Sequence, residues 1–176
     1  QEEFLAVGFQ KWLPEGVRWM SATKDYDATQ QRIEGYDPDH YMDMALTLPG
    51  HDVSNLTARR SYVAQFISKQ VNKLVNLTCL KDHQSAGVTL ALKNLSHGLV
   101  NNVSRSHSSP TLNACGAFIP AVCSLPVIRN KAVLHIVDGI LGLYHGGPSS
   151  NNKKQFVWEH KTMWFATDPV AIDKIG

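Results

Sequence analysis

Ionisable side chains stand at three places where an apolar stretch of the sequence ends. Lys81 and His83 follow the run VNKLVNLTCL, Asp138 follows AVLHIV, and Asp168 follows KTMWFA. Lysine can hold an anion, histidine can transfer a proton near neutral pH, and aspartate can orient that histidine or bind a metal. These segments are therefore candidates for parts of one small-molecule site.

Another polar group follows the first segment at helical spacing. Lys93 and His97 are four residues apart, so they share one face of a helix, and Asn94 lies beside them. One interpretation is an ordinary solvated helix face. The other is a cleft in which Lys93 holds an anionic group, Asn94 donates and accepts hydrogen bonds, and His97 transfers a proton.

The chain has eight histidines and three cysteines. No histidine pair forms H-x-x-x-H or H-E-x-x-H, and no cysteine pair forms C-x-x-C, so no common metal motif is present. The candidate metal ligands are His83, His107, Asp168 and Asp173. Asp168 has an alternative explanation as a helix N-cap before Pro169, whereas the sequence gives Asp173 no structural role.

The stretch from Gly139 to Pro148 is rich in glycine but matches neither G-x-G-x-x-G nor the P-loop. Its glycines are typical of a long loop with positive φ angles. The alternative is that Gly146 and Gly147 bind a cofactor phosphate through their backbone N–H groups.

Apolar periodicity predicts the elements that position these residues. Strands are expected at 71–80, 132–137 and 161–166, and helices at 61–70, 85–99, 118–128 and from 168 onward. Alternating helices and strands predict an α/β fold with a mostly parallel sheet and flanking helices. In such a sheet the carboxyl ends of the strands meet at one edge, where the polar residues would converge.

Composition and length narrow the class of protein. The 176 residues carry a net charge of +2, which is too small to favour nucleic acid as a partner. No apolar run reaches the roughly 18 residues that a membrane span needs. We expect an irregular N-terminal segment over 1–60 and an α/β core over 61–176. The ends of the chain suggest a piece of a longer protein, so the core is expected to be part of a larger domain.

Three stretches resemble the domain of unknown function 362 family. VNKLVNLTCLKDHQSAGVTLALKN resembles its apolar strand, Lys-x-His, Gly-Val/Thr turn and Ala-Leu-Lys-Asn helix. VLHIVDGI with the later HGGP resembles its Val-Asp-Gly and Gly-Pro pattern, and FATDPVAIDKIG resembles its Asp-Pro-Val-Ala-x-Asp helix start. The matching motif positions are Lys81, His83, Lys93, Asn94, Asp138, Gly147, Pro148, Asp168 and Asp173.

The resemblance implies little about chemistry, because the family is uncharacterised. Some members carry ferredoxin-like iron–sulfur segments, which implies a metal ion or an iron–sulfur cluster in the full-length protein. Some are exported in bacteria with twin-arginine signals, which implies a periplasmic or exported location. Without the resemblance, the expected location is cytoplasmic. This sequence has no ferredoxin-type run of cysteines.

Two functions are expected from these observations. The first is the binding of a small anionic ligand, cofactor or metal at the strand ends, with redox or proton-transfer chemistry as the candidate activity. Its expected catalytic residues are His83, Lys93 and Asp138, and its expected binding residues are Lys81, Asn94, His97, Gly146 and Gly147. The second is a non-catalytic binding or assembly module whose aromatic N-terminal segment contacts a partner chain or another copy in a homo-oligomer.

Overall fold

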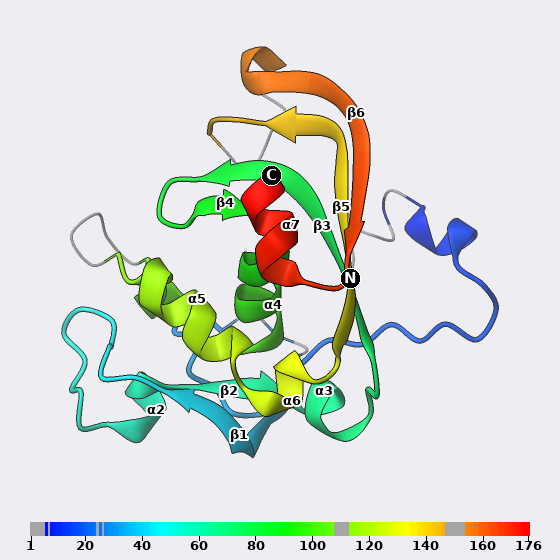
Figure 1. Cartoon of the computed structure of the whole chain (residues 1–176). Helices are drawn as coiled ribbons and strands as arrows, with labels where there is room; N and C mark the ends of the chain where they lie inside the picture. Colours follow the sequence, from blue (N-terminus) through cyan, green and yellow to red (C-terminus); the bar gives the residue numbers. More distant parts are fainter. Residues whose placement is uncertain (1–5, 7, 24, 26, 108–112, 147–153) are drawn as a thin grey trace.

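The computed structural model describes residues 6, 8–23, 25, 27–107, 113–146 and 154–176. Strands form two sheets with helices packed between and beside them (Figure 1). One sheet has the order β4-β3-β5-β6, with β3 at Leu74–His83, β4 at Gly87–Thr89, β5 at Ala132–Leu143 and β6 at Val157–Ala166. The other sheet pairs β1, Tyr36–Asp43, with β2, Arg60–Ala64.

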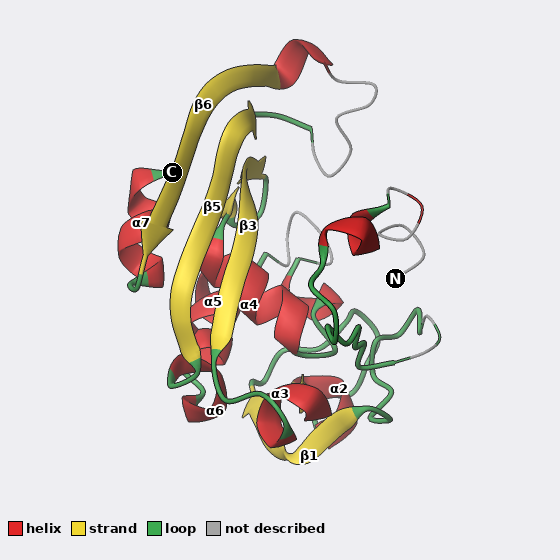
Figure 2. Cartoon of the chain, turned by 90° about the vertical axis from the view of Figure 1, so that its right-hand side faces the viewer, coloured by secondary structure: helices red, strands yellow, loops and turns green. Residues whose placement is uncertain are grey.

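Helices α4 (Ala91–Leu99) and α7 (Pro169–Ile175) pack on one face of the four-stranded sheet. In Figure 2 the strands β3, β5 and β6 stand in front of the helices that pack behind them. The helical elements are η1 (Phe9–Trp12), α2 (Leu56–Arg59), α3 (Gln65–Lys69), α4 (Ala91–Leu99), η2 (Ser104–Ser106), α5 (Cys115–Cys123), α6 (Pro126–Arg129), η3 (Lys154–Phe156) and α7 (Pro169–Ile175). None of the helices in the described residues is long and apolar enough to cross a membrane.

The chain has the predicted α/β fold, but the prediction of a mostly parallel sheet is wrong. Only β3 and β5 run parallel, joined by a crossover that contains α4, α5 and α6. β4 returns beside β3 after a short turn and so pairs antiparallel, because parallel neighbours need a long crossover. β6 follows β5 after residues 144–156 and also pairs with it antiparallel.

The predicted loop from residue 139 is also wrong, because β5 continues to Leu143. The glycines in this stretch make room for tryptophan rings. A Cβ atom on Gly142 would come within 2.2 Å of the Trp158 ring, and one on Gly139 would lie 3.3 Å from the ring of Trp164. The glycines thus allow close packing between β5 and β6. Because β5 is longer than expected, Asp138 lies in its middle instead of at its end.

Helix boundaries depart from the prediction where strands replace them. The predicted helix 61–70 divides into β2 and α3, because Tyr62 and Val63 pair with β1. The predicted helix 85–99 begins only at Ala91, after β4, and the predicted helix 118–128 divides into α5 and α6. The helix after Asp168 is confirmed, with Pro169 in its first turn. The expected irregular segment 1–60 includes β1, α2 and the first residue of β2.

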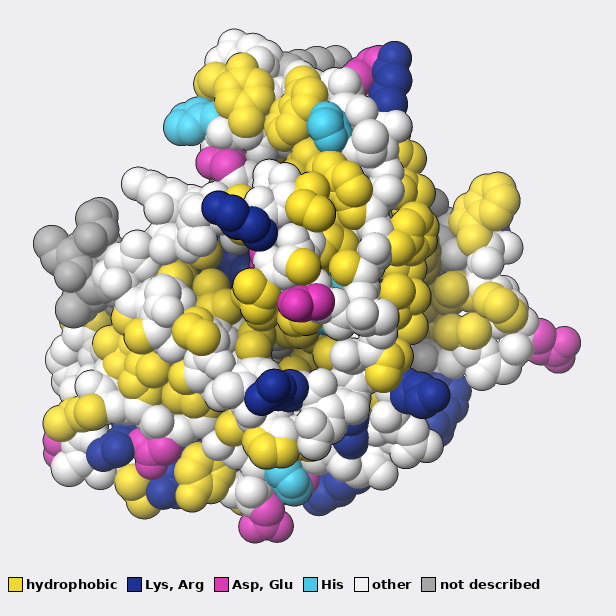
Figure 3. Space-filling view, in the orientation of Figure 1, with side chains coloured by type: hydrophobic (Ala, Val, Ile, Leu, Met, Phe, Trp, Pro, Cys, Tyr) yellow, Lys and Arg dark blue, Asp and Glu magenta, His cyan; other side chains and the backbone are white. Residues whose placement is uncertain are grey.

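The four-stranded sheet has two different faces. Asn76 and Thr78 of β3 turn towards the helices and are buried, as are His135 and Val137 of β5. The opposite face, which we call the outer face, carries rows of apolar side chains across three strands. One row is Leu77–Ile136–Phe165, and its two outer members are each 63% exposed. Hydrophobic side chains follow the strands along the right-hand flank in Figure 3.

Two clusters of apolar side chains form the core, and α4 contributes to both. Leu95 of α4 packs with Val63, Phe118 and Ile128 between β2, α5 and α6. At its other end, Ala91 packs with Leu80, Leu90, Val137 and Ile172 between the sheet and α7. Through these contacts α4 is held against both sheets.

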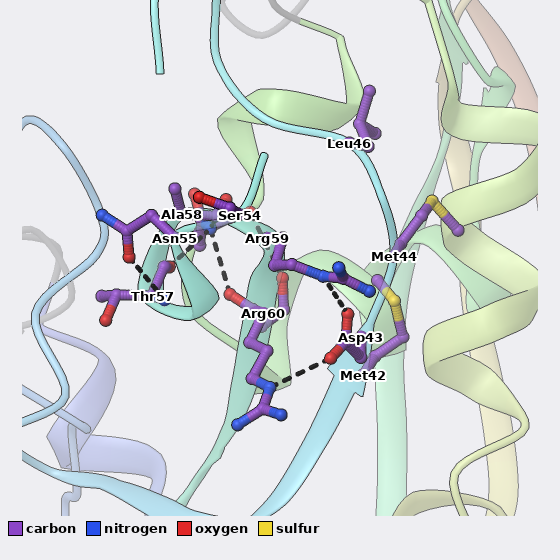
Figure 4. Close-up of polar contacts among 12 residues, drawn as sticks. Met42, Asp43, Met44, Leu46, Ser54, Asn55, Thr57, Ala58, Arg59 and Arg60 are labelled. Carbon is purple, nitrogen blue, oxygen red and sulfur yellow. Dashed lines mark hydrogen bonds and ion pairs between the residues drawn. The ribbon is translucent and has the colours of Figure 1, made fainter. Parts of the chain in front are cut away.

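Around β1 and β2, side chains bind backbone and charged groups. Asp43 accepts hydrogen bonds from the Nε atoms of Arg59 and Arg60, which ties the end of β1 to the start of β2 (Figure 4). Asn55 caps α2 by accepting from the N–H of Thr57 at 3.0 Å. The buried amide of Asn102 donates to the carbonyl oxygens of Ala58 and Arg60 and so fixes the chain that follows α4.

Arg105 is fully buried without a carboxylate partner among its described hydrogen bonds. Its guanidinium donates to the carbonyl oxygens of Met44, Leu46 and Asn102 and to the hydroxyl of Ser61. Burial lowers the pKa of Arg105 to about 10. These bonds anchor η2, the segment that leads into His107.

Asp173 closes the amino end of α4 from a distant part of the chain. Its carboxylate accepts hydrogen bonds from the N–H groups of Ala91 at 2.6 Å and Leu92 at 3.0 Å. The residue at the N-cap position, Leu90, has no side chain that can do this. Burial raises the pKa of Asp173, against the effect of these hydrogen bonds.

We expect Asp173→Ala to lower the free energy of unfolding by about 1–3 kcal/mol, because two buried N–H groups lose their acceptor. Urea unfolding followed by circular dichroism measures this. The control Glu159→Ala removes an exposed carboxylate that pairs with Lys161 and should change stability by less than about 0.5 kcal/mol. Equal effects of the two variants would contradict the capping role.

Candidate functional site

A cavity of about 480 Å³ opens where β3 and β5 end; we call it the rim cavity. Its lining residues are Lys81, Asp82, His83, Gln84, Ser85, His107, His145 and Gly146. The parallel pairing of β3 with β5 places Lys81 opposite Leu143, so the segment after β5 reaches the same edge. The predicted convergence of strand ends therefore holds for this one parallel pair.

His83 is held in one orientation by the turn that follows β3. Its Nδ1 accepts hydrogen bonds from the N–H groups of Ser85 and Ala86, each at 3.2 Å. Because Nδ1 is an acceptor in both bonds, the neutral ring carries its proton on Nε2. His83 is thus a hydrogen-bond donor at Nε2.

Behind the rim cavity, four side chains form what we call the serine-centred cluster: His97, Ser106, His107 and Cys115. The hydroxyl oxygen of Ser106 lies 3.0 Å from Nε2 of His97 and 3.1 Å from Nδ1 of His107. It lies 3.8 Å from Sγ of Cys115, a fully buried thiol at the start of α5. The rings of His83 and His107 are 5.6 Å apart, so the cluster borders the rim cavity.

Burial and two lysines keep these imidazoles neutral. Burial, followed by the charges of Lys93 and Lys81, lowers the pKa of His83 to about 4. Burial and the charge of Lys93 lower the pKa of His97 to about 3, and the same two causes lower the pKa of His107. Asp82 opposes the shift at His83 and is the weakest of its causes.

The structure separates two predicted site residues from this edge. Asp138 lies on the outer face beside Cys79 and Met163, in the middle of β5. Asp168 follows β6, which runs antiparallel, so it lies at the opposite end of the sheet. Its Oδ1 accepts from the N–H groups of Val170 and Ala171, the predicted N-cap role. The expected meeting of all three strand ends is therefore wrong.

The other predicted residues differ in their positions. Lys93 and His97 turn towards the serine-centred cluster, so this helix face is not simply solvated. Asn94 donates to Oδ1 of Asn76 and to the carbonyl oxygen of Leu77, which ties α4 to β3. Gly146 lines the rim cavity. Gly147 and Pro148 lie outside the described residues.

Sequence reasoning missed Ser106 and Cys115. The separation of eight positions between His107 and Cys115 matches no common ligand spacing. Their proximity comes from the packing of α5 against α4, which a pattern of spacings does not show. The buried ring of His135 is a further polar group, with Nδ1 bonded to Asn76 and Nε2 without a hydrogen-bond partner in the described structure.

The cysteines do not fit an iron–sulfur cluster of four thiolates. Cys79 lies exposed on the sheet, Cys115 lies in the serine-centred cluster, and Cys123 lies two helical turns further along α5. Sγ of Cys123 bonds the carbonyl oxygen of Leu92, and burial raises the pKa of this thiol to about 12. These three cysteines of the chain therefore face three different environments.

Comparison with known proteins gives one match. The family model described as "Domain of unknown function (DUF362)" matches residues 25–176. This range includes every residue of the rim cavity and of the serine-centred cluster. No curated protein and no solved structure matches the chain.

We expect acid to destabilise the fold through His83 and His97. Both pKa values are lowered from 6.5 in the folded protein, so the unfolded chain takes up protons first as the pH falls. The free energy of unfolding is therefore at its full value above pH 6.5 and decreases as the pH falls towards about 4 for His83 and about 3 for His97. In urea unfolding, the wild type should lose about 1 kcal/mol or more between pH 6.5 and 4.5.

His97→Gln should show a smaller loss over this pH range, because one of the two titrating groups is gone. The control His160→Gln changes a histidine on β6 outside the cluster and should keep the wild-type slope. Identical slopes for His97→Gln and the wild type would contradict the assignment.

Proposed function

The chain belongs to the domain of unknown function 362 family, and from this premise we propose that it binds a small ligand with an anionic group in the rim cavity. The proposal depends above all on the charge balance at this cavity. Lys81 lines it directly, and Lys93 acts on the histidines behind it. One carboxylate, Asp82, opposes two ammonium groups, so an anion gains from entering.

The neutral histidines support the same proposal. An imidazole that stays neutral beside two lysines can donate one hydrogen bond without adding charge. His83 is fixed with Nε2 as that donor by its two backbone bonds. An anion in the cavity would offset the lysine charges and raise the pKa of His83 towards its ordinary value. Ligand binding and proton uptake would then be coupled, which favours proton transfer among the expected reaction classes.

The roles follow from position. Lys81 binds the anionic group, His83 donates a hydrogen bond to it, and Lys93 supplies charge from behind. Asp138 is too far along β5 to orient His83, so we propose no catalytic role for it. A bacterial periplasmic or exported location stays a prediction from the family resemblance.

Isothermal titration with inorganic phosphate tests the proposal. We expect Lys81→Met to weaken phosphate binding by about tenfold or more, because one charge-assisted contact is lost. The control Lys161→Met removes an exposed lysine on β6 and should bind phosphate as the wild type does. Equal affinity in the wild type and both variants would place phosphate elsewhere and contradict the proposal.

A second candidate function is assembly, and the outer face is the observation that favours it. Large apolar side chains exposed in contiguous rows are typical of interaction surfaces. Apart from Asp138, the rows that cross β3, β5 and β6 at Leu77 and Cys79, and the pair of Val75 with Leu134, carry no charged residue. We propose a second copy of the chain as the partner, because two such faces can pack together as sheets do in a sandwich.

Light scattering over a range of concentrations tests assembly. We expect a dimer in the wild type and a monomer in Phe165→Lys, because a charge within the apolar row opposes burial of the outer face. The control Val170→Lys changes an exposed residue of α7, on the helix side of the sheet, and should leave the dimer intact. A monomeric wild type at all concentrations would exclude this function.

A further inference from the structure

Among the described residues, one group of three metal-ligating side chains has its donor atoms close together. A ring nitrogen of His97, a ring nitrogen of His107 and the thiol of Cys115 all lie within 4.8 Å of one another. The three come from separate elements: α4, the residue after η2, and the first turn of α5. We propose that they form a binding site for a divalent transition metal such as zinc, beside the cavity proposed above for an anion.

The donor set and its dimensions suit this class of metal. Imidazole nitrogen and thiolate sulfur are the ligands that zinc and its neighbours prefer over calcium or magnesium. Tetrahedral zinc, with bonds of about 2.0–2.3 Å, holds its donors roughly 3.3–3.7 Å apart. Donors within 4.8 Å therefore need to converge by about one ångström. The hydroxyl of Ser106, which contacts all three, marks the place that the ion takes when this side chain rotates away.

The hydrogen bonds of His97 are compatible with metal binding. Ser106 donates its one proton to the carbonyl oxygen of Val103 at 2.7 Å, so it accepts from Nε2 of His97. Ser96 can donate its one proton either to Nδ1 of His97 at 2.9 Å or to the carbonyl oxygen of Lys93 at 3.1 Å. It therefore supports either neutral tautomer of His97, as an acceptor from Nδ1–H or as a donor to unprotonated Nδ1.

A metal ion would select one of these two tautomers. When Nε2 of His97 binds the metal through its lone pair, Nδ1 keeps the proton and donates to Ser96. Ser96 then donates to the carbonyl oxygen of Lys93, which completes the supporting shell that metal-bound histidines have. Neutral imidazoles suit the site, because a protonated histidine cannot bind a metal.

Three protein ligands leave one position of a tetrahedral ion open. Because His107 also lines the rim cavity, that position faces a space that water or a ligand atom can reach. Lys93 is the charge that opposes a cation here. Burial lowers the pKa of Lys93, so its ammonium releases a proton more easily than a free lysine does.

Titration of the metal-free chain with Co²⁺ alone tests the site. We expect one Co²⁺ per chain, with visible bands of tetrahedral strength and a near-ultraviolet band from thiolate-to-cobalt charge transfer. Cys115→Ser should lose the charge-transfer band, whereas Cys79→Ser and Cys123→Ser should keep it. His107→Gln should weaken binding by about tenfold or more, and His145→Gln, changed in the same cavity outside the donor set, should not.

Lys93→Met separates this proposal from the anion site. It should tighten Co²⁺ binding and weaken phosphate binding, so each proposal can fail without the other. Circular dichroism of every variant checks that it folds. Absence of the charge-transfer band in the wild type, or its survival in Cys115→Ser, overturns the metal site. Co²⁺ binding that is the same in every variant would mean that surface histidines bind the ion, and this result would also overturn the metal site.

Discussion

The buried guanidinium of Arg105 is the constraint on which the arrangement of the site depends. It satisfies carbonyl oxygens after β1 and after α4 and the hydroxyl of Ser61 in β2, all without a carboxylate. A buried charge is tolerated only when its donors are satisfied, so these segments must meet around it. Ser106 and His107 follow Arg105 directly along the chain. Their position beside α4 is therefore set by bonds made on the opposite side of η2, away from the rim cavity.

Desolvation, more than any ion pair, sets the chemistry of this edge of the sheet. Burial is the largest cause of the lowered pKa at His83, His97, His107 and Lys93. The site therefore holds bases that keep their lone pairs at neutral pH, with the two lysine charges in and behind the cavity outnumbering the one carboxylate. Such an environment suits both an anionic ligand and a metal with nitrogen and sulfur ligands. The two proposed sites share His107, which lies between cavity and cluster.

The sequence predicted the apolar strands, the α/β class and the N-cap at Asp168, because these depend on local patterns. It did not predict the direction of β6, because the connection over residues 144–156 is long enough for either an antiparallel return or a parallel crossover. Gly142 was interpreted as part of a loop, but it lies in a strand, where the ring of Trp158 leaves no room for a side chain. His83 and Lys93 were identified from position along the chain. Cys115 and Ser106 were not, because only the packing of α5 on α4 brings them to the histidines.

The cap that Asp173 provides for α4 spans 82 positions of the sequence between its carboxylate and the N–H of Ala91. During synthesis, the helix that carries Lys93 and His97 leaves the ribosome long before its cap does. Its first turn can be completed only after α7 has been made and has docked. The cluster is therefore completed only once α7 has docked, and nascent chains still lacking α7 hold these histidines on an unfinished helix.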